Sequence, residues 1–310
     1  MKTCLIRLFV LLVLVLTIPT SASAAEKIKF GAPLWPGVTP KTHIVAQIIS
    51  AMGYQSELIE VGPPVIYKSM GFNDMDIFLG GWTPQQDPML DPQVKAGKVV
   101  KVRSNLSDAL IGVCVSDAAY EGGIKSLDDV HKYPEKFGKT IYNIEAGTGM
   151  HTAMESILKD NVGQLGDWEH VGTATSVMLA GVTSRINKGD WVVFGCWKPH
   201  WMDVEMDIHF LKGIPGSEAM ISGSSVYTVT RGGFAADYPE IQKLLENFSI
   251  TSQTQSEWIS EYSYKNNPAD QVASKWISAN LDQVKGWLKN VKTIDGKDAF
   301  EAVKAKYAKQ

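Results

Sequence analysis

Hydrophobic positions alternate between a two-residue and a 3.6-residue period along the first third of the chain, and this predicts strands and helices in turn. The expected strands are 27–34, 54–61, 76–82 and 98–106. A helix is expected over 39–52, with Thr39 as its N-cap and Gly53 after its end. A shorter helix is expected over 63–72. The resulting β-α-β-α-β order is typical of a mainly parallel sheet covered by helices.

The same alternation continues toward the C-terminus and then changes to helix alone. Further strands are expected at 109–116, 139–145, 191–197, 206–213 and 224–234. Helices are expected at 147–161 and within 169–189, and the chain is mostly helical from Ala236 onward. The apolar strand 109–116 is a candidate to cross between two lobes.

No repeat, low-complexity tract or composition break marks a linker, which favours a chain that passes twice between two lobes. We therefore expect an α/β protein of two lobes, each a mainly parallel sheet flanked by helices, with a ligand cleft between them. Lobe 1 would comprise residues 25–110 and 226–310, and lobe 2 would comprise residues 111–225.

The N-terminus has the pattern of an export signal. Lys2 and Arg7 precede an apolar stretch over 8–18, and small residues at 22–24 fit a cleavage site. Residues 1–24 are therefore predicted to be a cleaved signal peptide, which places the mature protein in a bacterial periplasm. No later stretch is apolar and long enough to span a bilayer.

Charge and composition argue against several function classes. The formal net charge is −3 with both signs interspersed, so no basic surface for nucleic acid is indicated. No run of Cys or His has metal-ligand spacing, and we expect neither a metal nor a cofactor. Six histidines are scattered without a nucleophile signature. Cys114 and Cys196 lie in strand-like runs, where a disulfide and two buried thiols are equally open. An exported hydrolase using Cys114 or a histidine is a minor alternative.

Three tryptophans, Trp35, Trp82 and Trp197, each stand directly after a strand pattern. Ligands of open α/β sheets bind outside the carboxyl ends of strands, so side chains placed there converge on one site. Indoles give the best cation–π faces, and several together form a cage for a quaternary ammonium group. Core packing is the alternative for any single tryptophan, but three equivalent positions favour the cage. Trp201 and His200 are candidates for a further wall, and packing or a place at the rim of the cleft is the alternative for Trp201.

Two turns are candidates for the other end of a ligand. Gly37 and Val38 can present backbone N–H groups before a helix, where free donors and the helix dipole favour an anion. An ordinary strand-to-helix turn is the alternative there.

The second turn follows the strand at 139–145. Glu145 can complement a cation or play a structural part, and Thr148, Gly149 and His151 open the next helix, where a hydroxyl or imidazole can bond a ligand oxygen. The segment is not a P-loop, because the lysine and the spacing are missing.

The exported two-lobe pattern together with DIFLGGWTP, IYNIEAGTG and GCWKPHWM resembles the substrate-binding proteins of glycine betaine, choline and proline-betaine ABC transporters. The resemblance covers essentially the whole mature chain. It implies the type II periplasmic-binding fold, in which two α/β lobes close on a ligand. It also implies that Trp35, Trp82 and Trp197 surround a trimethylammonium group.

The chain departs from the choline-binding pattern of that family. An Asp of choline binders is replaced by Gly37, a tyrosine of the crossing strand by Ile111, and an Asn-Asp-rich turn by Thr148-Gly149-Met150. These changes favour a betaine or carnitine-like zwitterion over an alcohol. Trimethylamine N-oxide and choline remain alternatives, the former because a protonated Glu145 can bond its oxide.

The expected function is capture of such a solute and its delivery to the permease subunits of an ABC importer, by a monomer that makes and breaks no bond. A ligand sensor for a membrane receptor is the alternative of another class.

Overall fold

The computed structural model describes residues 27–308, so the predicted signal peptide lies outside the described residues. The strands are β1 (Ile28–Gly31), β2 (Ser56–Ile59), β3 (Ile77–Thr83), β4 (Val99–Ser116), β5 (Thr140–Ile144), β6 (Glu169–Thr173), β7 (Val193–Lys198), β8 (Ile208–Phe210) and β9 (Ser222–Arg231). The α-helices are α1 (Thr39–Ala51), α2 (Pro63–Met70), α3 (Asp87–Lys95), α4 (Asp117–Glu121), α5 (Leu127–Val130), α6 (Pro134–Phe137), α7 (Gly149–Lys159), α8 (Thr175–Ile186), α9 (Met202–Glu205), α10 (Phe234–Asp237), α11 (Pro239–Asn247), α12 (Ser252–Ile259), α13 (Ala269–Ala279), α14 (Leu281–Trp287) and α15 (Ala299–Tyr307). Two irregular turns are the 3-10 segment η1 (Val162–Gln164) and the π-helical segment η2 (Ser260–Tyr264).

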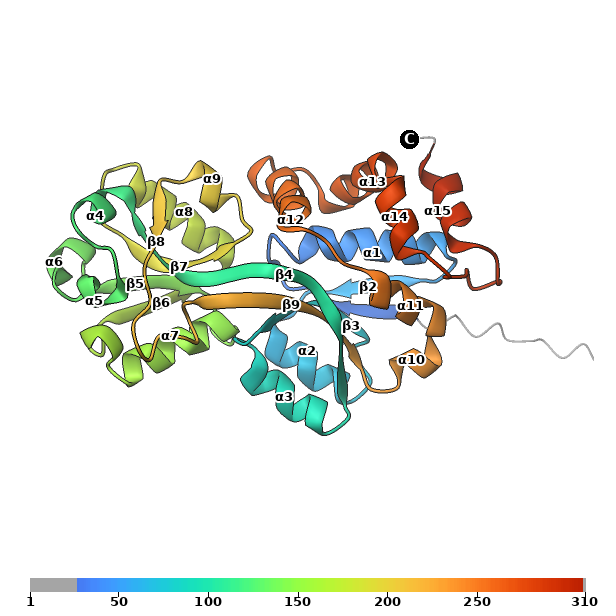
Figure 1. The fold of residues 1–310 in the computed structure, drawn as a ribbon, viewed down its shortest axis with the longest axis horizontal. Helices are drawn as coiled ribbons and strands as arrows, with labels where there is room; N and C mark the ends of the chain where they lie inside the picture. The colour runs from blue at the N-terminus through green and yellow to red at the C-terminus, as the bar shows by residue number, and fades with distance from the viewer. Residues whose placement is uncertain (1–26, 309–310) are drawn as a thin grey trace, which may run out of the picture.

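Two lobes lie side by side and are joined by the long strands β4 and β9, as Figure 1 shows. The strand order is β2-β1-β3-β9-β4-β7-β5-β6, with β8 also paired to β4. Strand β1 is parallel to β2 and β3, and β5 is parallel to β6 and β7. The pairs made by β4 and β9 are antiparallel. The predicted α/β class of two helix-flanked lobes is confirmed, and antiparallel pairing is confined to the strands that pass between the lobes and their partners.

Two strand predictions differ from the structure. The expected strands 98–106 and 109–116 are one continuous strand, β4, because register shifts against β9 accommodate the exposed residues Ser107 and Asp108. The prediction within 169–189 named a helix alone and missed β6, whose sequence EHVGT lacks an apolar alternation. Residues 169–173 form a strand because they pair in parallel with β5, although their own sequence does not predict one.

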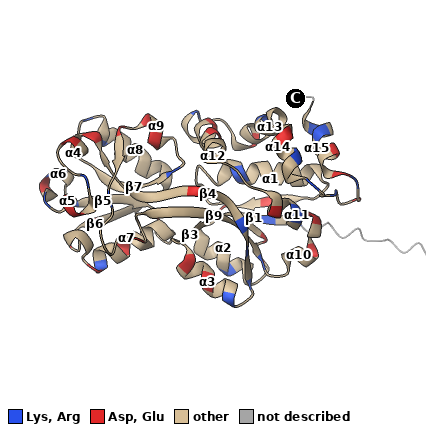
Figure 2. Ribbon diagram, viewed as in Figure 1, with Lys and Arg blue, Asp and Glu red and all other residues tan. Residues whose placement is uncertain are grey.

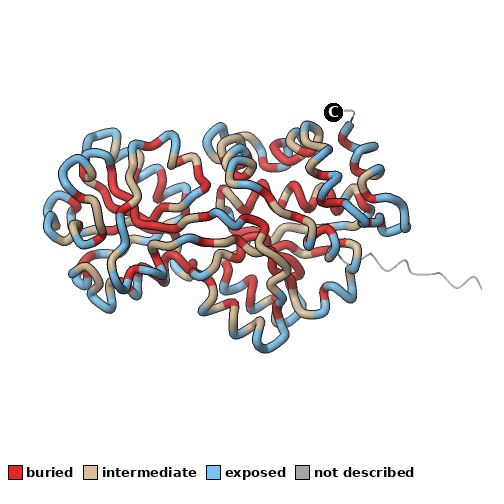
Figure 3. Tube along the Cα trace, in the orientation of Figure 1, coloured by how far each residue is buried: buried red, intermediate tan, exposed pale blue. Residues whose placement is uncertain are grey.

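Each lobe has its own apolar core, and the buried segments follow the central strands in Figure 3. One cluster combines residues from both ends of the chain, from Ile28 to Tyr307. A second cluster uses residues from Ile111 to Met220 alone. A smaller cluster around Tyr67 and Phe78 lies under α2 and α3. The lobes are thus packed separately, and the space between them is free to serve another purpose.

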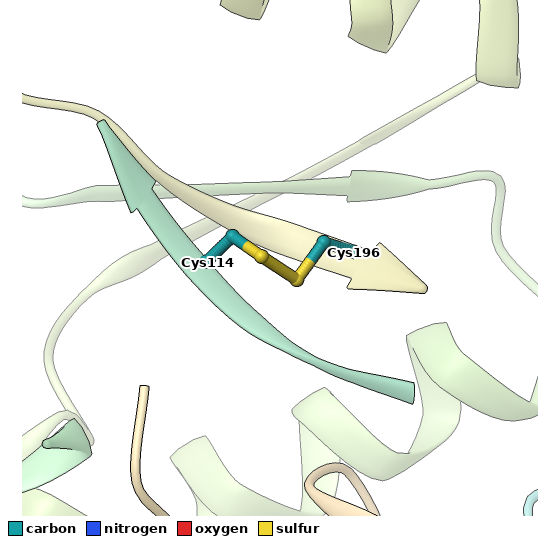
Figure 4. The surroundings of a disulfide bond; sticks show 2 residues. All are labelled: Cys114 and Cys196. Atoms are coloured by element: carbon teal, nitrogen blue, oxygen red, sulfur yellow. A yellow bond between two sulfur atoms is a disulfide. The ribbon is translucent and has the colours of Figure 1, made fainter. Parts of the chain in front are cut away.

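Cys114 and Cys196 form a disulfide between neighbouring strands β4 and β7 (Figure 4). Their Cα atoms are 5.8 Å apart, within the range that a bridge requires. The sequence left a disulfide and two free buried thiols as alternatives, and the structure has the disulfide.

Charged residues of both signs are distributed over the helices of both lobes (Figure 2). Among residues 27–308, no helix is long and apolar enough to cross a membrane. In the same range, no three His, Cys, Asp or Glu side chains gather in a way that could hold a metal ion.

Candidate functional site

A cavity of about 60 Å³ lies between the lobes, where the loop after β1, the ends of β3 and β7 and the start of α7 meet. Trp35, Trp82 and Trp197 all line it. Its placement beyond the carboxyl ends of parallel strands agrees with the rule that motivated their choice. This volume is several times the minimum that one enclosed water molecule needs.

Trp35 is held by a bond that connects segments of the two lobes. Its indole Nε1–H donates to Oε1 of Glu145 at 2.6 Å, and its ring is tilted against Phe78 with centroids 6.4 Å apart. The main chain turns tightly here, because the carbonyl of Trp35 accepts from the N–H groups of both Val38 and Thr39 at 3.0 Å. The bond fixes the plane of the ring at the cavity wall.

Trp82 and Trp197 occupy matching positions at the ends of β3 and β7. Each stands two residues before a proline that follows a cis peptide bond, Pro84 and Pro199. Trp82 packs against the apolar clusters of both lobes. Trp197 is supported from behind by His200, whose ring meets it edge-on at 5.0 Å. The three indoles are half-buried, with the remaining surface available to the cavity.

His200 is therefore a support and does not line the cavity. It is buried, and burial lowers its pKa to about 3, so the ring is neutral at ordinary pH. Its Nδ1 accepts from the backbone N–H of Met202 at 3.2 Å.

Trp201 lies in a separate hollow between α9, α12, η2 and α13. Its Nε1–H donates to the hydroxyl of Ser263 at 3.1 Å, and its ring is 5.5 Å from that of Tyr264. Trp201 is thus a contact between the lobes at the rim of the cleft, and it does not line the cavity that the three indoles line.

The turn at Gly37 and Val38 provides less for an anion than the sequence suggests. The N–H of Val38 is already bonded to the carbonyl of Trp35, so the expectation of two free donors is wrong. Gly37 lines the cavity, and its carbonyl accepts from Nε2 of Gln255 at 2.7 Å. The prediction that Thr39 caps α1 is also wrong, because its hydroxyl donates to the carbonyl of Trp35 at 3.1 Å and the helix begins without a side-chain cap.

At the second turn, which follows β5, one candidate residue lines the cavity and another does not. Thr148 lines the cavity, but its hydroxyl caps α7 by accepting from the N–H of His151 at 3.1 Å and donates to the carbonyl of Glu145 at 3.0 Å. His151 is buried behind the turn, where its Nδ1 lies 3.0 Å from the carbonyl of Ile144 and its ring stacks on His170. His151 does not reach the cavity, because the helical turn directs it back toward β5 and β6.

Gly149 lines the cavity and lies close to the main chain of the other lobe. A Cβ atom on Gly149 would lie 2.4 Å from the backbone oxygen of Gln85. Gln85 is itself held by β9, since its amide bonds the hydroxyls of Ser222 and Ser224 at 3.1 Å. The contact requires a glycine at this position in the closed arrangement.

Five polar residues of the cavity wall were missed by the sequence analysis: Lys41, Gln85, Gln86, Thr175 and Gln255. The signal for Lys41 was present, since its position shares a helical face with Val45 and Ile48. The hydroxyl of Thr175 and Oε1 of Gln255 are buried without a hydrogen-bond partner among the described residues. Thr175 begins a helix that carried no motif, and Gln255 reaches the site from a distant part of the chain, so no local pattern identified them.

A two-lobe α/β fold with a cavity between the lobes defines a substrate-binding protein of the type II periplasmic class. Residues 26–279 match the OpuAC family, the substrate binding domain of ABC-type glycine betaine transport systems. The chain belongs to this family, which is one of transport components.

Three known proteins illustrate the likeness. A choline binding protein of an ABC transporter, solved with choline, superposes with a TM-score of 0.87 at 28% identity, over 91% of this chain and 98% of that one. Lactococcal OpuAC, solved with glycine betaine, superposes with a TM-score of 0.76 at 22% identity, over 84% and 99% of the two chains, and this likeness concerns the fold. The glycine betaine/carnitine transport binding protein GbuC of Listeria monocytogenes is 29% identical over 165 residues, which are 52% of this chain and 53% of GbuC.

Proposed function

We propose that this protein captures a quaternary ammonium zwitterion, glycine betaine or a carnitine-like compound, and delivers it to the permease of an ABC importer. The observation that carries the proposal is the gathering of Trp35, Trp82 and Trp197 on one interlobe cavity. The names of the choline and glycine betaine/carnitine binding relatives support the ligand class. Export to the periplasm and action as a monomer are parts of the same proposal.

The energetics are consistent with micromolar capture. A cation over a desolvated indole gains ~0.5–2 kcal/mol, so three faces supply ~2–6 kcal/mol. Micromolar affinity requires about 8 kcal/mol. The remainder is assigned to buried methyl groups, at ~25 cal/mol per Å², and to bonds at the anionic end.

The zwitterion is preferred over choline because Ile111 supplies an aliphatic wall on the crossing strand and Gly37 has no carboxylate to bond an alcohol. Trimethylamine N-oxide is the second candidate, since Oε2 of Glu145 is buried without a partner among the described residues. A thermal-shift panel of glycine betaine, proline betaine, carnitine, choline, dimethylsulfoniopropionate and trimethylamine N-oxide ranks these ligands. A role as a sensor for a membrane receptor would use the same cavity, and uptake assays with the permease distinguish the two.

The cage is tested by Trp82→Ala and Trp197→Ala. Each change removes one cation–π face and part of the wall, so we expect glycine betaine binding to become undetectable by calorimetry while circular dichroism is unchanged. Trp191→Ala is the matched control, because Trp191 packs on Phe137 and does not line the cavity. Near-wild-type affinity in either cage variant would remove that tryptophan from the proposed site.

A further inference from the structure

A lysine lies in the wall of a cavity that we propose for a cation. Lys41 is 1% exposed, and its Nζ donates to Oδ1 of Asn105 at 2.8 Å and lies 3.5 Å from the carbonyl of Leu79. Both partners are neutral, and no carboxylate of a described residue lies within salt-bridge distance of this ammonium group. Buried ammonium groups without a counter-charge are costly, so one is expected to serve a purpose.

Lys41 is the one charged side chain among the described residues that line the cavity. Glu145 is not among the lining residues, and its Oε1 accepts a hydrogen bond from the indole of Trp35. Tyr67 is bonded to Gln86, a neutral lining residue. The cavity therefore has an indole-lined part suited to a cation and a single fixed cationic group.

The elements packed against Lys41 provide no counter-charge for it. Strand β3 has no ionisable side chain. The ionisable side chains of α1, β4 and β9 bond other groups or are solvent-accessible: His43, Lys101, Arg103, Asp108, Tyr227 and Arg231. The acidic side chains of β2, α12, α13 and α15, which pack on α1, are solvent-accessible: Glu57, Glu257, Asp270 and Glu301. The missing partner is thus not supplied by these neighbours.

We propose that Lys41 recognises the acidic group of the ligand, whose carboxylate supplies the counter-charge that the protein lacks. This inference rests on the proposed function and narrows it: the ligand carries a carboxylate, and a purely cationic ligand such as choline is disfavoured by the same lysine. The nitrogen end lies against the indoles, and the carboxylate end lies toward Lys41.

The proposal implies that binding is coupled to protons. Burial lowers the pKa of Lys41 to about 7 in the unliganded protein. A carboxylate beside the ammonium favours the charged form and raises this pKa, whereas a second cation lowers it. Above about pH 7 a zwitterion therefore binds with proton uptake, whereas choline releases a proton chiefly near and below pH 7, where Lys41 is still charged in the unliganded protein.

Calorimetry on the wild-type protein tests the coupling without a mutation. Titrations with glycine betaine and with choline are run at about pH 6.5, 7.5 and 8.5, each in two buffers of different ionisation enthalpy. Between about pH 7 and 8.5, we expect the Kd for glycine betaine to increase roughly tenfold, with net proton uptake. Choline affinity changes in the opposite direction. Glycine betaine affinity that is independent of pH, with no proton exchange, would overturn the role of Lys41.

The variant Lys41→Met keeps the length of the side chain and removes its charge. We expect glycine betaine affinity to decrease at least tenfold, proton uptake to vanish and choline affinity to be kept or improved. His43→Gln, on the same helix but outside the cavity, is the control. Circular dichroism checks that Lys41→Met is folded. Lys41→Gln removes the same charge with a polar side chain and provides a second variant if Lys41→Met does not fold. Equal loss of both ligands in the folded variants would contradict charge recognition, whereas failure of the wild type to bind either ligand would defeat the proposed function itself.

Discussion

The bond between Trp35 and Glu145 shows how single residues organise the cavity. An indole N–H that donates to a carboxylate makes a charge-assisted bond, which is stronger than one between neutral groups. The carboxylate also lies at the edge of the Trp35 ring, next to one of the proposed cation–π faces. Because the two residues belong to different lobes, the same bond links ligand geometry to lobe closure.

Glu145→Gln keeps an acceptor for the indole but removes the charge. We expect glycine betaine to bind roughly threefold to tenfold more weakly, because the change removes a charge-assisted bond and a negative charge near the cation. Glu145→Ala should cost more, since the ring of Trp35 is then unrestrained. Calorimetry measures both, with Glu155→Gln on the exposed side of α7 as the control. Unchanged Kd values in both Glu145 variants would show that the carboxylate has no part in binding.

At the scale of elements, the disulfide ties the crossing strand β4 to β7, the strand that ends at Trp197. The two cysteines are separated by 82 residues, so the bridge closes most of the second lobe into one loop. A cross-link of this span stabilises the fold chiefly by restricting the unfolded chain.

The double variant Cys114→Ala and Cys196→Ala is expected to lose ~2–4 kcal/mol of unfolding free energy, since a long loop is released in the denatured state. Urea titration followed by circular dichroism measures the loss. Reduced wild-type protein is the companion sample and should give the same midpoint as the variant. A midpoint equal to that of oxidised wild type would contradict a stabilising bridge.

Sequence pattern predicted most elements, because the end of a strand is a local signal. It also predicted that the three indoles lie near one another, because the carboxyl ends of parallel strands meet at the same edge of a sheet. It failed where tertiary contacts decide. Strand β6 exists through its pairing with β5, and the N–H of Val38 is satisfied within its own turn. His151 is directed away by a helical turn that the sequence did not orient, and Lys41 was overlooked because it lies on an apolar helical face.

At the scale of the whole molecule, the backbones of the two lobes approach each other closely beside the cavity. Gly149 at the start of α7 meets the main chain of Gln85, which is held in place by β9. At the rim, Trp201 bonds Ser263 across the same interface. We therefore expect ligand affinity to depend on contacts that do not touch the ligand.

Gly149→Ala is expected to hinder closure, because its Cβ would collide with a backbone atom that cannot move cheaply. Binding of glycine betaine should weaken at least tenfold, while the melting temperature of the unliganded protein stays within a few degrees. Small-angle scattering with saturating ligand should show a wider particle than wild type. Gly181→Ala on α8 is the matched control, since a Cβ there meets nothing within 4 Å. Full affinity in Gly149→Ala would show that the lobes close by a different route.

The two cores differ in when they can be completed during synthesis. Every buried residue of the second cluster is supplied by one uninterrupted stretch, whereas the first needs β9 between β3 and β4 and then the helices up to α15. The half that contains the N-terminus must therefore wait for the last residues of the chain, although it is begun first. A truncated polypeptide ending before β9 would leave the earlier half unfinished and the later half nearly whole.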